Sequence, residues 1–222
     1  MTEARLREEI CRVGRSLFAR GYVHATAGNI SARLADGFLI TPTDACLGFL
    51  DPARLSRVDA SGASLAGDPP SKTLALHRRI YSADPAAGCV IHTHSTHLVA
   101  LTLGGAWSEA ELLPPITPYF VMKVGHVPRI AYHRPGDPRV ADLVGEAIAS
   151  AAQRAAPIRA VMLDRLGPNV WHETPAAAMA VLEELEETAR AWLVSGRRAE
   201  PLDDNRIDEL RRCLGLVAAQ FG

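Results

Sequence analysis

The sequence predicts a single α/β domain whose sheet has an antiparallel part, and three observations carry this prediction. The chain has 222 residues, enough for one domain to bury a sizeable core, and no linker-like segment divides it. Segments with helical periodicity alternate with short runs that are rich in β-branched residues. The early strands come in pairs around short turns, which is typical of antiparallel hairpins.

Helices are expected where apolar residues recur every three or four positions. Residues 3–20 carry such a stripe from Leu6 to Phe18, and Gly21 follows as a C-terminal cap. A helix of about three turns is expected from Ser71, whose hydroxyl can cap the first turn. Three more helices are expected: one that begins at Ser95 or Thr96, and two that cover residues 138–153 and 174–195.

Strands are expected in the runs between these helices. Two short strands should surround the Asp36-Gly37 turn, and residues 51–68, which contain Gly62 and Gly67, indicate a second hairpin. The other expected strands are "GCVIHTH" (88–94), "VPRIAYH" (127–133) and "AVML" (160–163).

Charge and cysteine content exclude several classes of protein. The chain has 24 Lys+Arg against 25 Asp+Glu, so neither nucleic acid nor an anionic membrane is expected as a partner. It has no signal-peptide pattern and no apolar run approaching the ~20 residues that span a bilayer. The four scattered cysteines predict reduced thiols in a cytoplasmic protein.

The acidic segment "LEELEETARAW" (182–192) indicates a solvated or inter-subunit helix face.

Two histidines lie at the end of one predicted strand. In "CVIHTHSTHLVAL" (89–101), His92 and His94 are two positions apart, so a strand projects both imidazoles to the same face. Such a pair of neutral ring nitrogens is a common start of a transition-metal site. His97 falls on the following helix, where packing or hydrogen bonding is expected. The pair predicts a metal site without naming the metal or the reaction.

Small residues, hydroxyls and an amide recur at expected element ends in three other segments. These segments are "AGNIS" (27–31), "TPTD" (41–44) and "PSK" (70–72). Their N–H and O–H groups can surround a phosphate, to which a helix beginning near Ser71 adds its positive end and Lys72 a charge. Together with the histidine pair, they predict a phosphorylated small molecule held beside a metal.

The order of motifs along the chain resembles the class II aldolase/adducin family. The motifs are "AGNISARL", "ITPTDACLGFLDPARLS", "GDPPSK", "HTHSTH", "TPYFVMKVGHVP", "YHRPGDP" and "LEELEETA". Within the family they most resemble the 3-oxo-tetronate 4-phosphate decarboxylase branch. The resemblance implies one domain over residues 1–222, with a core at about 5–195 and a helical tail at 203–222. It also implies a three-layer fold with a nine-stranded, mostly antiparallel sheet, and a homotetramer with active sites between subunits.

Carried over residue by residue, the resemblance assigns roles to positions of this sequence. His92 and His94 match two of the family's three metal-ligating histidines, with Zn²⁺ as the usual ion and Mn²⁺ or Fe²⁺ as alternatives. The substrate- and phosphate-binding positions are Asn29, Thr43 and Ser71, with Gly28 and Lys72 beside them.

The implied activity is that of a metal-dependent lyase acting on a small phosphorylated sugar acid or ketose. Decarboxylation of a 3-oxo-tetronate 4-phosphate is the leading hypothesis, because loss of CO₂ leaves an enediolate that a bound dication stabilises. An L-fuculose-phosphate-type aldolase or a sugar-phosphate epimerase passes through the same enediolate and is the enzymatic alternative. A non-catalytic, adducin-like binding or assembly protein is the alternative from another class.

The sequence departs from the family at two positions of the expected site. Thr73 stands where the family has an acid/base glutamate, and a threonine hydroxyl does not accept a proton near neutral pH. Leu166, in "DRLGP" (164–168), stands at the third metal histidine. A site with two histidines alone binds metal weakly. Tyr119 is a candidate for supplying a proton through its phenol.

Three hypotheses are open for the lost third ligand. In the first, Asp164 replaces the histidine, provided that the preceding strand continues and turns its carboxylate to the same face. In the second, His126, His133 or His172 takes the place. In the third, the site has decayed and no metal is bound.

Overall fold

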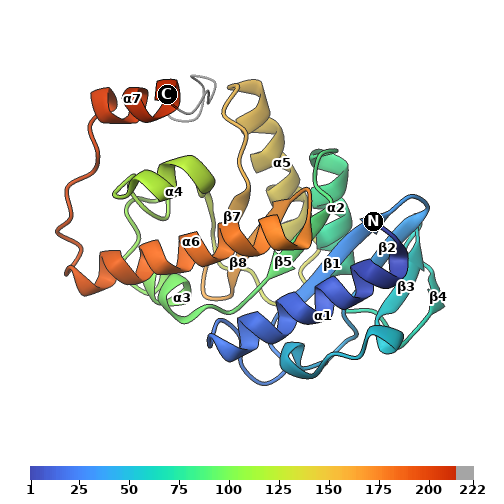
Figure 1. Cartoon of the computed structure of the whole chain (residues 1–222). Coiled ribbons are helices and arrows are strands. Elements are labelled where there is room, and N and C mark those ends of the chain that lie inside the picture. The colour runs from blue at the N-terminus through green and yellow to red at the C-terminus, as the bar shows by residue number, and fades with distance from the viewer. Residues whose placement is uncertain (214–222) are drawn as a thin grey trace.

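The computed structural model describes residues 1–213, which form one sheet between two layers of helices (Figure 1). The strand order is β4-β3-β2-β1-β5-β8-β7-β6, and all neighbours are antiparallel except the parallel pair β6 and β7. The strands are β1 (Asn29–Leu34), β2 (Gly37–Ile40), β3 (Ser56–Asp59), β4 (Ser64–Ala66), β5 (Cys89–His92), β6 (Arg129–Ile130), β7 (Ala160–Leu163) and β8 (Gly167–His172). The predicted α/β, mostly antiparallel fold is confirmed, with eight strands in the described residues where the resemblance implied nine.

Helices α1, α3, α4 and α6 lie on one side of the sheet, and α2 and α5 lie on the other (Figure 1). The helices are α1 (Glu3–Ala19), α2 (Leu74–Ala83), α3 (Thr96–Thr102), α4 (Pro118–Lys123), α5 (Arg139–Gln153), α6 (Pro175–Val194) and α7 (Asp204–Cys213), with the 3₁₀ turns η1 (Leu47–Phe49) and η2 (Pro52–Arg54). The tail expected over residues 203–222 is helical in α7, and its remainder lies outside the described residues. Across residues 1–213, no helix combines the length and apolar character needed to cross a membrane.

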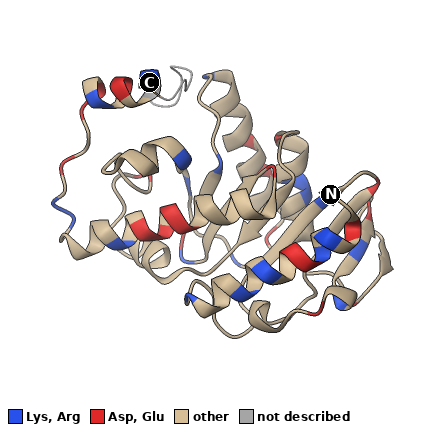
Figure 2. Cartoon of the chain, viewed as in Figure 1, with Lys and Arg blue, Asp and Glu red and all other residues tan. Residues whose placement is uncertain are grey.

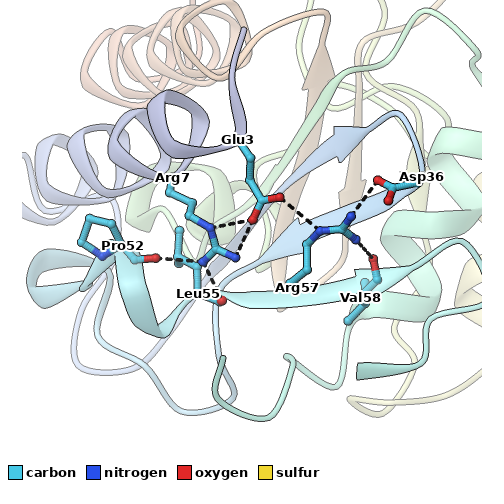
Figure 3. A network of polar contacts seen from close by, with 7 residues as sticks. All are labelled: Glu3, Arg7, Asp36, Pro52, Leu55, Arg57 and Val58. Carbon is cyan, nitrogen blue, oxygen red and sulfur yellow. Dashed lines mark hydrogen bonds and ion pairs between the residues drawn. The ribbon is translucent and has the colours of Figure 1, made fainter. Parts of the chain in front are cut away.

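The N-terminal helix is fixed at both ends by interactions that the sequence encodes. Thr2 Oγ1 accepts the backbone N–H of Arg5 at 3.3 Å, and Gly21 follows the helix with a φ of 75°. Figure 3 shows the ion-pair network that ties its first turn to β3: Glu3 binds both Arg7, at 2.8 Å, and Arg57, at 3.3 Å. The helix therefore closes over the hairpin strands at this end of the sheet.

Alternation along β5 divides its side chains between two cores. Ile91 belongs to the large core on the α1/α6 side, whereas Val90 packs in the core beneath α2 and α5. His92 is two residues after Val90 and so projects toward the α2/α5 side of the sheet. The pleat thus carries the histidine to a face covered by two helices.

Some element boundaries differ from the sequence predictions. Helix α2 begins at Leu74, and Ser71 is not its cap, because the Ser71 N–H pairs with the Thr41 carbonyl and holds Ser71 in the preceding loop. The short helix α4 and strand β8 were not predicted, since prolines interrupt both segments. Proline 168 is compatible with β8 because it lies near the start of the strand.

The acidic segment of α6 is not simply solvated. Acidic residues gather along this helix in Figure 2, but the Glu186 side chain is buried. Its carboxylate accepts the backbone N–H groups of His97 and Leu98, both at 3.1 Å, and contacts His97 Nδ1 at 2.8 Å. Glu186 therefore fixes the start of α3, which directly follows the histidine pair. The predicted hydrogen-bonding role of His97 is confirmed.

Candidate active site

Three loops that are distant in the sequence meet where β2 and β5 end and β1 begins. The Ile30 N–H donates to Thr41 Oγ1 at 3.1 Å, and the Thr41 N–H donates to the Ile30 carbonyl at 2.9 Å. The Ser71 N–H reaches the Thr41 carbonyl at 3.2 Å, and the Thr43 N–H reaches the Pro69 carbonyl at 2.9 Å. These bonds bring together the three polar segments singled out in the sequence.

The loop before β1 also lies against the histidine strand. Asn29 and His92 are direct partners in the antiparallel pair of β1 and β5. Gly28 has a φ of 85°, and a β-carbon there would lie 2.9 Å from the His92 carbonyl oxygen. This close approach requires glycine at position 28. Gly28 and Asn29 are therefore adjacent to the histidine pair.

His92 and His94 lie side by side although β5 ends at His92. Their ring centroids are 5.1 Å apart. His92 Nδ1 lies 2.9 Å from the Pro168 carbonyl, to which it donates in that tautomer, leaving Nε2 as the atom that can ligate a metal. Burial, reinforced by His94, lowers the pKa of His92 to about 4, and burial also lowers the pKa of His94. Both rings are therefore neutral near pH 7, the form that binds metal.

The structure does not join any of the predicted third ligands to this pair. Strand β7 ends at Leu163, so Asp164 lies in the following turn, and its carboxylate forms an ion pair with Arg129 at 2.7 Å. The other candidates have partners of their own: His126 contacts Glu111, His133 contacts Asp137 and His172 contacts Arg159. Within the part of the chain that the structure describes, no three His, Cys, Asp or Glu side chains gather closely enough to hold a metal ion.

Three neighbours of the histidine pair were missed by the sequence analysis. His24 lies with its ring centroid 6.4 Å from that of His94. His77 of α2 is fully buried, its Nδ1 is 2.7 Å from Ser31 Oγ, and burial lowers its pKa to about 3. Asn169 of β8 is the direct strand partner of His92. His24 directly precedes the "ATAGNIS" segment, so it could have been proposed as a site residue from the sequence. Asn169 could not, because only the pairing of β5 with β8 brings it next to His92.

The remaining predicted residues differ in their surroundings. Thr73 Oγ1 lies 3.0 Å from Ser71 Oγ, which places it in the loop cluster. Lys72 is exposed beside it. Tyr119, on α4, is 58% exposed, with Lys123 Nζ 5.4 Å from its ring centroid. A surface pocket of about 250 Å³ is lined by Thr43 and residues of the loop that follows it, but not by the histidines.

Known proteins resemble this chain over most of its length. The family model described as Class II Aldolase and Adducin N-terminal domain matches residues 8–193. A 3-oxo-tetronate 4-phosphate decarboxylase from Cupriavidus necator is 56% identical over 217 residues, covering 95% of this chain and 96% of the relative.

Two solved structures extend the comparison to the fold. YgbL from Klebsiella pneumoniae, described as a putative aldolase/epimerase/decarboxylase, has a TM-score of 0.84 and 42% identity, covering 95% of this chain and all of the other. The L-fuculose-1-phosphate aldolase from Thermus thermophilus has a TM-score of 0.74 and 28% identity, covering 90% of this chain and all of the other. The resemblance expected from the motifs is thus confirmed, and the chain belongs to the class II aldolase and adducin family.

Proposed function

We propose that this protein is a lyase that decarboxylates a 3-oxo-tetronate 4-phosphate. The observation that carries the proposal is the meeting of the loops around Asn29, Thr43 and Ser71 beside His92. Relatives that carry this activity in their names, at 36–56% identity over most of the chain, support the choice of substrate.

The loop cluster is proposed to hold the phosphate. Asn29, Thr43 and Ser71 supply amide and hydroxyl groups, Gly28 lets the loop before β1 lie against the His92 backbone, and Lys72 contributes a positive charge. Because Lys72 is exposed, it remains free to approach an anion from the solvent side. In this arrangement the phosphate end of the substrate lies beside the loops and its reacting carbons lie toward the histidine pair.

His92 and His94 are proposed to hold a divalent cation, with Zn²⁺ as the first candidate. Their neutral rings and the occupied Nδ1 of His92 fit such an ion. When bound, the ion supplies Lewis-acid stabilisation of the negative charge that develops on the 3-oxo oxygen. Thr73 stands where the family has its acid/base glutamate and does not supply a proton near neutral pH, so the later protonation of carbon is assigned to water or to Tyr119.

Tyr119 is proposed to reach the site of a neighbouring subunit. The side chain is 58% exposed, and large apolar side chains such as Trp107 and Tyr132 are also exposed on this chain. Exposed aromatic groups of this size are typical of surfaces that become buried in assemblies. We therefore propose a homotetramer with active sites between subunits.

The proposal is tested by measuring CO₂ release from a 3-oxo-tetronate 4-phosphate. Wild-type protein is expected to release CO₂, and His94→Ala and Ser71→Ala are expected to lose activity at least about 100-fold. Ser64→Ala, on the exposed edge strand β4, is the matched control and should retain full activity. Cleavage of L-fuculose 1-phosphate without any CO₂ release would instead assign the chain to the aldolase alternative.

A further inference from the structure

A row of three polar side chains crosses the sheet at the histidine site. Asn29 on β1 pairs directly with His92 on β5, and His92 pairs directly with Asn169 on β8. Directly paired residues of antiparallel strands project to the same face, with β-carbons roughly 5 Å apart. The face is the one beneath α2 and α5, because Val90 and Trp171, two residues away on their strands, pack in that core.

Asn169 is the member of this row that nothing else in the protein explains. Its side chain is fully buried, and neither its Oδ1 nor its Nδ2 has a hydrogen-bond partner. Its strand partner on the other side is Val161, an apolar residue of the core. A buried amide without a partner is unfavourable, whereas an apolar residue of equal size would fit this environment. The amide therefore has a use other than packing.

The orphaned polar atoms lie on the His92 side of Asn169. Asn29 Oδ1 and His77 Nε2 are also buried without a hydrogen-bond partner. His77 is held on this face through Ser31, which lies two residues after Asn29 on β1. The one other buried atom in the described residues without a hydrogen-bond partner, Glu183 Oε1 on α6, lies 3.2 Å from Arg20 Nε, so the unmatched atoms with no ion-pair partner belong to Asn29, His77 and Asn169.

We infer that Asn169 Oδ1 is the third protein ligand of the cation proposed at His92 and His94. This inference rests on the proposed function, because it presupposes that the histidine pair binds a metal. Because His92 and Asn169 are direct strand partners, with β-carbons roughly 5 Å apart, an imidazole nitrogen of His92 and the amide oxygen of Asn169 would be able to hold the same ion. Leu166, at the position of the family's third histidine, packs against the apolar core instead.

The alternatives for the third ligand are less suited to the role. Asp164 would have to leave Arg129, and the three histidines considered from the sequence are engaged with Glu111, Asp137 and Arg159. Asn169 needs no such exchange, since both of its polar atoms lack partners. A neutral amide oxygen leaves the full positive charge of the ion available to an anionic substrate.

The test is Zn²⁺ binding by the metal-free full-length chain, measured by titration calorimetry without substrate. Asn169→Leu, a nearly isosteric change, is expected to weaken binding at least 10-fold while the apo protein keeps or gains thermal stability. Asn169→Asp is expected to tighten binding, because a carboxylate is the stronger zinc ligand. Val170→Ala is the control, since Val170 lies on the same strand but packs in the opposite core. It should lower stability and leave zinc affinity unchanged.

The outcomes separate this inference from the proposed function. Unchanged zinc affinity in both Asn169 variants, with binding lost in His94→Ala, overturns the role of Asn169 and leaves the metal site in place. A wild-type chain that binds no Zn²⁺ overturns the role of Asn169 together with the proposed metal. If Asn169→Leu does not fold, a zinc affinity of Asn169→Asp equal to that of wild type overturns the inference by itself.

Discussion

The stability of the metal-free protein is predicted to fall steeply as the pH is lowered from 7 to 5. The two imidazoles responsible are His77 and His92, both buried and both held neutral by their surroundings. Burial lowers the pKa of His77 from 6.5 to about 3 and that of His92 from 6.5 to about 4. Unfolding exposes both rings to water, where they take up protons near pH 6.5.

The sign and size of the effect follow from these pKa values. A group whose pKa is lower in the folded state binds more protons when unfolded, so its contribution to stability is complete above pH 6.5 and is lost as the pH falls. Each ring contributes about 1.4 kcal/mol per pH unit over the range in which only the unfolded state is protonated. The pair therefore lowers the free energy of unfolding by about 4 kcal/mol between pH 7 and pH 5.

Other groups modify this total without reversing it. Burial also lowers the pKa of His94 and His172, which adds to the loss of stability. Burial raises the pKa of Glu186, which acts in the opposite direction as that carboxylate takes up a proton. A loss of about 4 kcal/mol is a large part of the ~5–15 kcal/mol that stabilises a typical domain.

The assay is urea unfolding followed by circular dichroism at pH 7, 6 and 5, in buffer containing a chelator. The wild-type midpoint should fall at each step, and His77→Gln, which removes one of the two imidazoles, should show about half the pH dependence. Equal midpoints for the wild-type protein at pH 7 and pH 5 would refute the reasoning. If the urea midpoint of His77→Gln changes with pH as much as that of the wild-type protein, His77 does not contribute to the pH dependence.

Three further predictions concern the frame of the site. Glu186→Ala leaves the N–H groups of His97 and Leu98 unpaired and should cost about 2–4 kcal/mol in urea unfolding, whereas Glu109→Gln at an exposed position should cost almost nothing. Leu166→His places an imidazole at the family's third histidine position and should tighten Zn²⁺ binding roughly 10-fold or more in calorimetry; no gain would mean that this turn does not face the histidine pair. Gly167→Ala introduces a β-carbon that overlaps the Thr93 carbonyl and should lower stability by about 2 kcal/mol or more in thermal unfolding. Its control, Gly136→Ala, also has a positive φ but meets no neighbouring atom within 4 Å, so equal losses in both variants would contradict the role of the overlap.

Local patterns were sufficient to predict most elements of the fold. The stripe from Leu6 to Phe18 and the Asp36-Gly37 turn gave α1 and the hairpin of β1 and β2, because periodicity and turn chemistry are local properties. The start of α2 was placed too early, since Ser71 is held by a tertiary hydrogen bond to Thr41. Strand β8 escaped prediction for a similar reason, because its pairing with β5 and β7 outweighs the proline near its start.

The candidate site was predictable only where a single segment carries it. His92 and His94 lie two residues apart, and their proximity follows from the chain itself. Asn169 lies 77 residues after His92 in the chain, and only the register of β5 against β8 makes the two residues neighbours. The expectation for Asp164 depended on β7 continuing, but the strand ends one residue earlier and Arg129 takes the carboxylate.

The replacement of glutamate by Thr73 bears on which reaction this site can support. Aldol cleavage begins with removal of a hydroxyl proton, for which the site offers at Thr73 only a hydroxyl that is hydrogen-bonded to Ser71. Decarboxylation breaks the bond between the carboxylate carbon and its neighbour, and the electron pair moves toward the 3-oxo oxygen while CO₂ leaves. That step requires stabilisation of negative charge but no base. A site with paired neutral histidines and a threonine at position 73 is therefore better matched to loss of CO₂ than to cleavage between two hydroxylated carbons.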